Sequence, residues 1–138
     1  MKTKKAIRAM VLSAVAVFGI RAFAETLYVD CNDPNATYRT IQAAIGAAKD
    51  NDVILVAPGD YCNDVIAYGA DGARARVVVN RNLSNLVIEA EDPDPSKTRI
   101  IGAYDDGNAN KVGPNAVMCM IVTASVPVTI KGFTFLNG

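Results

Sequence analysis

The sequence contains no histidine, and this absence removes several common forms of catalysis. Without an imidazole the chain cannot assemble a Ser-His-Asp triad, a Cys-His pair or a histidine-bound zinc ion from its own residues. The cysteines show no C-x-x-C spacing, and no G-x-x-x-x-G-K-[ST] loop is present to hold nucleotide phosphates. The sequence therefore says more about architecture than about a reaction.

The first 24 residues have the composition of a secretory signal peptide. A basic segment, MKTKKAIR, precedes the apolar run AMVLSAVAVFGI, and small residues at Ala22 and Ala24 have the spacing that signal peptidase reads. We expect cleavage after Ala24, which leaves a domain of residues 25–138 that is extracellular, periplasmic or on the cell surface. The apolar run is shorter than the roughly 20 residues of a membrane-spanning helix, so we expect no span after cleavage.

Cleavage makes the remaining chain acidic. Loss of residues 1–24 takes away five of the 14 basic residues and no acidic residue. Residues 25–138 therefore keep 9 basic and 14 acidic side chains, a net charge of −5. Nucleic-acid phosphates and acidic lipids both require a basic protein face. We therefore expect neither as a partner.

Three cysteines remain in a compartment where disulfides persist. Cys31 follows the strand-like LYVD, and Cys62 follows VILVAPGDY. If these two segments lie side by side in parallel, both thiols emerge at the same end, so we favour a Cys31–Cys62 disulfide with Cys119 free. Three unpaired thiols that act as small apolar side chains are the alternative.

One amphipathic helix is predicted over residues 41–49. Thr40 can cap its first turn, and apolar side chains recur at the helical spacing of one buried stripe, at Ile41, Ala44, Ile45 and Ala48. Such a short helix needs a surface to pack on.

After this helix the apolar period changes from 3.6 to 2, which is typical of strands. Three similar segments, VILVA, LVIEA and VTIKG, begin at Val53, Leu86 and Val128, at intervals of 33 and 42 residues. Further strand-like segments lie between them, beginning at Val65, Arg76, Thr98 and Ala116. A repeat of this length predicts a solenoid of short parallel strands, with the helix as a lid on its first coil.

Aligning the three segments without a gap predicts which side chains share a face. One face would hold Leu55, Ile88 and Ile130, and the opposite face would hold Val56, Glu89 and Lys131. The first set is uniformly apolar, which predicts that it faces the core.

These segments resemble the N-terminal part of right-handed parallel β-helix proteins of the pectate lyase and pectinesterase superfamily. The resemblance rests on YRTIQAAIGAAKDNDVILVAPGDY at 38–61, NLVIEA at 85–90 and VTIKGFTFLNG at 128–138. It implies an all-β fold, a right-handed parallel β-helix (solenoid) with an N-terminal amphipathic capping helix, cut after two to three coils. Pectinesterase-like members commonly carry Glu two positions after the Tyr of Pro-Gly-x-Tyr, where this chain has Asn63, and the departure argues against an esterase.

Glu89 and Lys131 are the candidate substrate-binding residues. On neighbouring strands, a carboxylate and an ammonium could hold a sugar or its uronate; a structural ion pair is the alternative. A glycosidase would need two carboxylates across one bond, and Glu89 has no evident partner for that role. Sugar rings could also stack on tyrosines, which more often cover the edge of a core: Tyr28, Tyr38, Tyr61, Tyr68 and Tyr104.

We expect no cofactor, although calcium is conceivable at two acidic turns, 91–95 and 104–108. Neither turn has the ligand spacing of an established calcium motif, so no metal ligand is named. Asp and Asn in turns commonly cap the local backbone instead.

The resemblance implies the leading segment of a secreted protein that binds or degrades polysaccharide or a cell-surface glycan. Lyase or esterase chemistry in this family is carried by residues of later coils, so no catalytic residue is assigned and no activity is expected from this chain alone. A non-catalytic, adhesin-type β-helix protein is the alternative. A complete small secreted domain without enzymatic activity is a third hypothesis.

Overall fold

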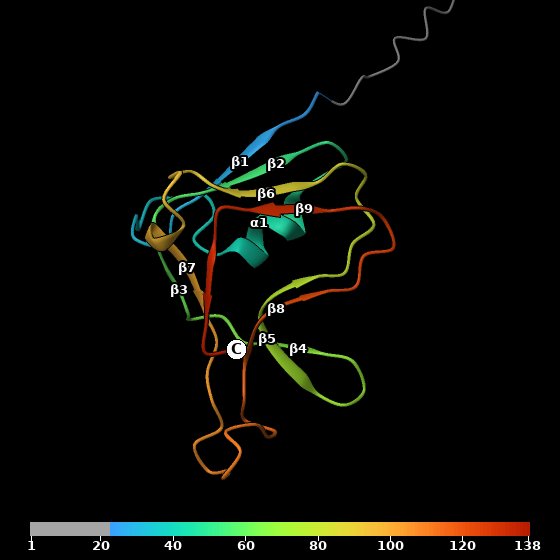
Figure 1. Ribbon diagram of the computed structural model, residues 1–138. Coiled ribbons are helices and arrows are strands. Elements are labelled where there is room, and N and C mark those ends of the chain that lie inside the picture. The colour runs from blue at the N-terminus through green and yellow to red at the C-terminus, as the bar shows by residue number, and fades with distance from the viewer. Residues whose placement is uncertain (1–22) are drawn as a thin grey trace, which may run out of the picture.

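The computed structural model describes residues 23–138, so most of the predicted signal peptide lies outside the described residues. The described chain is mostly β-sheet with one short α-helix, which confirms the all-β class (Figure 1). The helices are α1 (Ile41–Ala47) and the 3-10 turn η1 (Pro95–Lys97). The strands are β1 (Thr26–Val29), β2 (Val53–Val56), β3 (Gly59–Tyr61), β4 (Ile66–Tyr68), β5 (Ala73–Val79), β6 (Val87–Ala90), β7 (Thr98–Ile101), β8 (Met118–Val122), β9 (Thr129–Lys131) and β10 (Thr134–Leu136).

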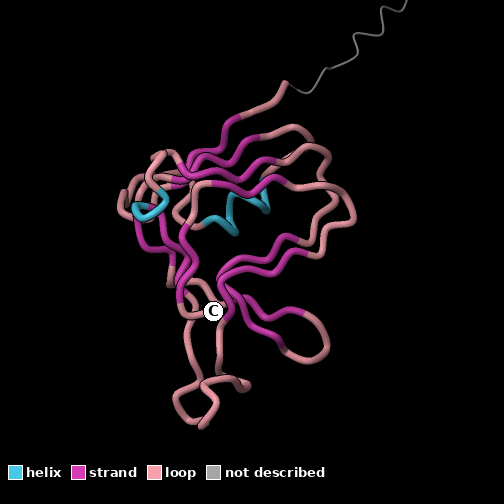
Figure 2. The backbone as a smooth tube through the Cα atoms, in the orientation of Figure 1, coloured by secondary structure: helices cyan, strands magenta, loops and turns pink. Residues whose placement is uncertain are grey.

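The chain passes through three sheets in turn (Figure 2). The first sheet has the order β1-β2-β6-β9, the second β3-β7-β10 and the third β4-β5-β8. Every neighbouring pair is parallel except β4 with β5, which form an antiparallel pair. Consecutive strands from β5 onward lie in different sheets, and each pairs with the strand one circuit away. The predicted parallel stacking of short strands is confirmed.

The register of β2 against β6 differs from the predicted alignment by one residue, whereas the register of β6 against β9 agrees with it. Ile54 pairs with Ile88, which pairs with Ile130, and these side chains point toward the core. The alignment placed Leu55 in that position, which was wrong. A slip of one residue exchanges the two faces of a strand, and β2 is apolar on both faces, so alternation could not reveal the error.

Two stacked asparagines mark the observed register. Asn51 and Asn85 each lie two residues before a strand and have positive φ angles of 68° and 57°. Asn85 Nδ2 donates to Asn51 Oδ1 at 2.9 Å, and the backbone N–H of Asn51 donates to the Ser84 carbonyl at 2.8 Å. The repeated sequence N-x-V-I, at 51–54 and 85–88, is the local signal that would have aligned the strands correctly.

Helix α1 packs against β1, β2 and β5, which are early strands of the first and third sheets. The hydroxyl of Thr40 accepts from the Ala43 N–H at 3.1 Å, as predicted for the helix cap, and the buried stripe includes Ile41, Ala44 and Ile45. The helix ends at Ala47, two residues before the predicted end. Gln42 Oε1 accepts from the Val78 N–H at 2.8 Å, so α1 also satisfies a backbone donor of β5.

Arg81 ties the end of α1 to the segment that follows β5. Its Nη1 donates to the carbonyls of Ile45, Gly46 and Ala48 at 2.6, 2.9 and 2.9 Å. The last carbonyls of a helix have no partner within it, so a guanidinium there satisfies them and complements the negative end of the helix dipole. The short helix is therefore held in place from both ends.

Candidate functional site

The outer face of the first sheet carries a continuous row of four side chains. Tyr28 pairs with Leu55, Leu55 with Glu89, and Glu89 with Lys131, so one side chain from each strand lies beside the next. We call these four residues the outer row. Adjacent strands lie about 4.8 Å apart, so the row runs roughly 14 Å across the sheet.

Glu89 and Lys131 form an ion pair in this row, which confirms that they are neighbours on adjacent strands. The Lys131 side chain is 61% exposed and that of Glu89 is 26% exposed. Surface ion pairs of this kind contribute about 0 to 1 kcal/mol, so the pair adds little to stability. Its ammonium remains open to solvent on one side, and the proposed role in binding substrate stays a prediction.

Tyr28 presents an aromatic ring at the other end of the outer row. The residue is 42% exposed, and its hydroxyl donates to Glu91 Oε2 at 2.9 Å. This hydrogen bond holds the ring in place and raises the pKa of the Tyr28 hydroxyl. Of the other tyrosines, Tyr61 is buried, whereas Tyr104 is exposed on a loop.

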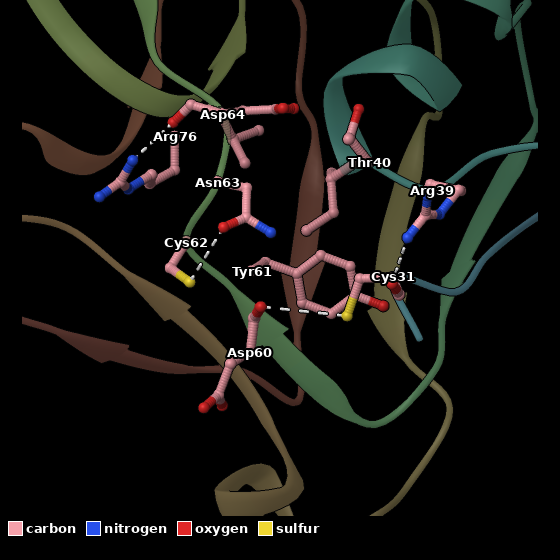
Figure 3. Close-up of a pocket in the computed structure, with 11 residues that line it drawn as sticks. Cys31, Arg39, Thr40, Asp60, Tyr61, Cys62, Asn63, Asp64 and Arg76 are labelled. Atoms are coloured by element: carbon pink, nitrogen blue, oxygen red, sulfur yellow. Dashed lines mark hydrogen bonds between the residues drawn. The ribbon is translucent and has the colours of Figure 1, made fainter. Parts of the chain in front are cut away.

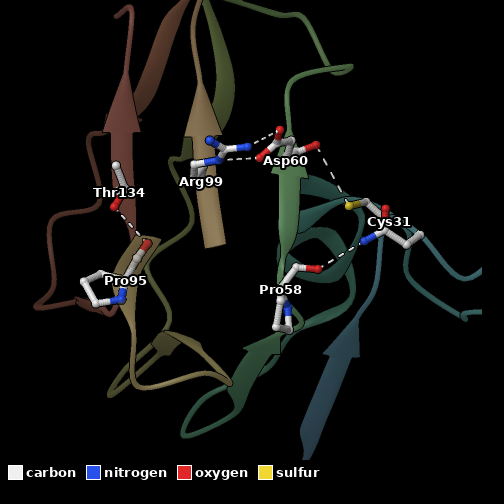
Figure 4. Close-up of polar contacts among 7 residues, drawn as sticks. Cys31, Pro58, Asp60, Pro95, Arg99 and Thr134 are labelled. Carbon is white, nitrogen blue, oxygen red and sulfur yellow. Dashed lines mark hydrogen bonds and ion pairs between the residues drawn. The ribbon is translucent and has the colours of Figure 1, made fainter. Parts of the chain in front are cut away.

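The outer face of the second sheet carries a second ion pair, which the sequence did not reveal (Figure 4). Arg99 donates to Asp60 through two bonds, Nε to Oδ1 at 2.6 Å and Nη2 to Oδ2 at 2.7 Å. Asp60 holds the pKa of the Arg99 guanidinium above its ordinary value. Thr134 follows Arg99 in register and donates to the Pro95 carbonyl at 2.8 Å. Alternation of period two in β3 and β7 could have predicted that Asp60 and Arg99 point outward. It could not have predicted the register that places them side by side.

A cavity of about 220 Å³ lies where β3 meets the start of α1 and the strand β5 (Figure 3). Its polar lining mixes carboxylates, guanidinium groups and thiols. The lining residues are Cys31, Arg39, Thr40, Ile41, Asp60, Tyr61, Cys62, Asn63, Asp64, Arg76 and Val77. Arg76 is held there by bonds from Nε to the Ile101 carbonyl at 2.7 Å and from Nη1 to the Asp64 carbonyl at 2.8 Å.

Two of the three cysteines line this cavity, and all three are free thiols in the structure. Cys31 Sγ donates to the Asp60 carbonyl at 3.9 Å, whereas Cys62 Sγ donates to Asn63 Oδ1 at 3.7 Å (Figure 3). Burial raises the pKa of the Cys31 thiol. The two thiols therefore share a cavity but contact different acceptors, and the Cys31–Cys62 disulfide stays a prediction. Cys119 is buried and donates to the Leu136 carbonyl at 3.1 Å.

Three carboxylates of the two acidic turns, those of Asp92, Asp94 and Asp105, bond to the backbone of their own loops. Asp92 Oδ1 accepts from the Asp94 N–H at 2.9 Å, and Asp94 Oδ1 accepts from the Ser96 N–H at 3.0 Å. In the second turn Asp105 accepts from the Gly107 and Asn115 N–H groups, both at 3.2 Å. These contacts follow the backbone-capping alternative, and among residues 23–138 no three His, Cys, Asp or Glu side chains gather as metal ligands do.

Comparison with known proteins assigns the chain to no family. No protein-family model, curated protein or solved structure matches the chain. Within the described part of the chain, neither helix has the length and apolar character that crossing a membrane would require. The functional inference therefore rests on the sequence pattern and the two outer faces.

Proposed function

We propose that this chain is an exported right-handed parallel β-helix segment that binds polysaccharide through the outer row of its first sheet. The fold part of the proposal is supported by the circuit through three sheets with parallel neighbours. It is also supported by the spacing of paired strands: residue 53 pairs with 87 and residue 87 with 129, offsets of 34 and 42 residues. Repeats of this length are typical of solenoids.

The outer row carries the proposal because it combines two groups that recognise acidic sugars. The exposed ring of Tyr28 offers an apolar face to the C–H groups of a pyranose, and the Lys131 ammonium offers a charge to a uronate carboxylate. A sheet face with these groups at the two ends of one row suits an extended chain. Glu89 would exchange its contact with Lys131 for a sugar hydroxyl.

Affinity electrophoresis through a gel that contains polygalacturonate tests this proposal. We expect the wild-type chain to be retarded, and expect Tyr28→Ala and Lys131→Gln each to weaken binding about tenfold, since each removes one anchoring contact. Lys111→Gln is the matched control, because Lys111 also pairs with a carboxylate, Asp106, at 2.8 Å, but lies on a loop between β7 and β8. Equal retardation of all four proteins, or no retardation of any, would contradict the proposal.

A non-catalytic role, as in an adhesin-type protein, is the alternative for the whole protein. It is favoured by the pairing of two outer-face carboxylates with basic side chains: Glu89 contacts Lys131, and Asp60 contacts Arg99. Each of these carboxylates is paired with a basic side chain, whereas glycoside hydrolysis by paired carboxylates requires two carboxyl groups on opposite sides of the glycosidic bond. We expect no ultraviolet-absorbing unsaturated product when this chain is incubated with polygalacturonate.

A further inference from the structure

A buried carboxylate lies at the point where the described fold begins. Asp52, directly before β2, is only 2% exposed. Its Oδ1 accepts from the backbone N–H of Glu25 at 2.8 Å, and its Oδ2 accepts from the Lys49 N–H at 2.7 Å. The Glu25 carbonyl in turn accepts from the Val53 N–H at 2.9 Å. Glu25 is thus held on both sides, directly before β1.

The bond that precedes Glu25 is the one at which the sequence predicts signal-peptide cleavage. Hydrolysis of the Ala24–Glu25 peptide bond consumes one water molecule and releases a carboxylate on Ala24 and an ammonium on the Glu25 nitrogen. Before cleavage that nitrogen is a neutral amide with a single N–H. After cleavage the same atom carries a positive charge and three N–H donors.

We propose that cleavage after Ala24 creates an ion pair between the new α-ammonium of Glu25 and the buried carboxylate of Asp52, which locks β1 onto β2. A buried carboxylate is costly unless it is paired with a charge, and among residues 23–138 the hydrogen-bond partners of the Asp52 carboxylate are the backbone amides of Glu25 and Lys49. A free α-amino group has an ordinary pKa of about 7.7 to 8.0, so most of it is charged at neutral pH. Charge-assisted hydrogen bonds are about twice as strong as neutral ones.

The proposal assigns a role in maturation to a carboxylate that the polysaccharide site does not use. Removal of the leader would stabilise the fold at the moment the chain becomes free of it. This inference rests on the export that is part of the proposed function. It does not depend on polysaccharide binding, so the two can fail separately.

The decisive comparison is between chains that begin at Glu25 and at Ala24, each released from a cleavable fusion. Every described strand and helix lies at or after residue 26, so both chains contain the whole described fold. Both also carry one α-ammonium, but only the first places it at Asp52. We expect urea unfolding to give a folding equilibrium constant about tenfold larger for the chain that begins at Glu25. Equal constants would overturn the proposal.

Asp52→Asn should abolish the difference between the two chains, whereas Asp50→Asn should preserve it. Asp50 is the matched control because its Oδ1 also accepts a backbone N–H, that of Ser84 at 2.9 Å. A difference that persists in Asp52→Asn would overturn the ion pair.

If Asp52→Asn does not fold, the acylation rate of the α-amino group tests the proposal instead. In the folded wild-type protein, acylation of the α-amino group should be about tenfold slower for the Glu25 start than for the Ala24 start, because a paired ammonium is rarely deprotonated. Equal acylation rates would overturn the proposal. Mass spectrometry of the chain exported with its own leader should show Glu25 as the first residue, and any other start would also overturn it.

Discussion

At the scale of single residues, Tyr61 links three segments around the core. Its ring is buried, and its hydroxyl donates to the Ala57 carbonyl at 2.9 Å and lies 3.4 Å from the Val29 carbonyl. Burial raises the pKa of this hydroxyl far above its ordinary value of 10.0. The folded protein therefore keeps the proton over a range in which the unfolded chain releases it.

Tyr61→Phe should make the protein less sensitive to alkaline pH. In the wild type, the folded state binds more protons than the unfolded state once the pH exceeds the unfolded pKa, so stability falls as the pH rises through about 10. Tyr61→Phe has no hydroxyl to ionise, so it lacks this part of the alkaline loss of stability. At neutral pH it should be about 1 kcal/mol less stable than the wild type, because the hydrogen bond of the hydroxyl is missing. Urea midpoints at neutral pH and near pH 11 measure both effects.

Tyr104→Phe is the control for this prediction, because it removes an exposed hydroxyl. Some alkaline loss should remain in Tyr61→Phe, since the pKa values of Tyr28 and Cys31 are also raised. An alkaline loss as steep as that of the wild type would show that Tyr61 ionises as freely in the folded chain as in the unfolded one.

At the scale of elements, β2 shows how a strand with two apolar faces is oriented. Ile54 and Val56 are fully buried, whereas Val53 and Leu55 are only partly covered on the outer face. Since the strand itself does not distinguish the two faces, the stacked asparagines at its start and the neighbouring strands decide which face is buried.

Alanine substitution at two neighbouring positions tests this orientation. Ile54→Ala should lower the free energy of unfolding by about 2 to 5 kcal/mol, because it leaves a cavity in the core. Leu55→Ala should cost about 1 kcal/mol, because its side chain is partly solvated. Urea denaturation measures both, and a larger loss for Leu55→Ala would favour the register of the gapless sequence alignment.

At the scale of the whole molecule, the first and last strands of the three sheets differ in what covers them. The end formed by early strands is covered by α1, whose contacts include the Gln42 bond to β5 and the Arg81 bonds to its last turn. At the other end, β8, β9 and β10 are the outer strands of their sheets within residues 23–138. Several large apolar side chains are exposed there, namely Met118, Val122, Phe135 and Leu136.

Charged substitutions at this second end should reduce self-association. Edge strands without a partner pair readily with other chains, and charged side chains discourage that pairing. We expect Val122→Lys and Phe135→Lys each to lower the light scattering of a concentrated solution during incubation. Val112→Lys is the matched control, because Val112 is 71% exposed but lies on the loop before β8. An equal effect of Val112→Lys would assign the change to net charge.

The sequence by itself determined the local structure and its approximate spacing. Alternation of apolar residues predicted most of the strands, although not β3 and β10. The apolar stripe with Thr40 predicted α1, and the repeat predicted the parallel pairing that makes Glu89 and Lys131 neighbours. These features depend on residues close together in the chain, or on a repeat that tolerates a small error in alignment.

Only the tertiary structure decided the exact register and the contacts that depend on it. The inward position of Ile54, the pairing of Asp60 with Arg99 and the approach of Glu25 to Asp52 each join segments that lie 27 or more residues apart. Turn lengths and core packing set such contacts, and a slip of one residue leaves the apolar pattern of β2 unchanged while it moves every side chain to the opposite face. The apolar pattern alone therefore cannot choose between the two registers, whereas the repeated N-x-V-I sequence and the packed core can.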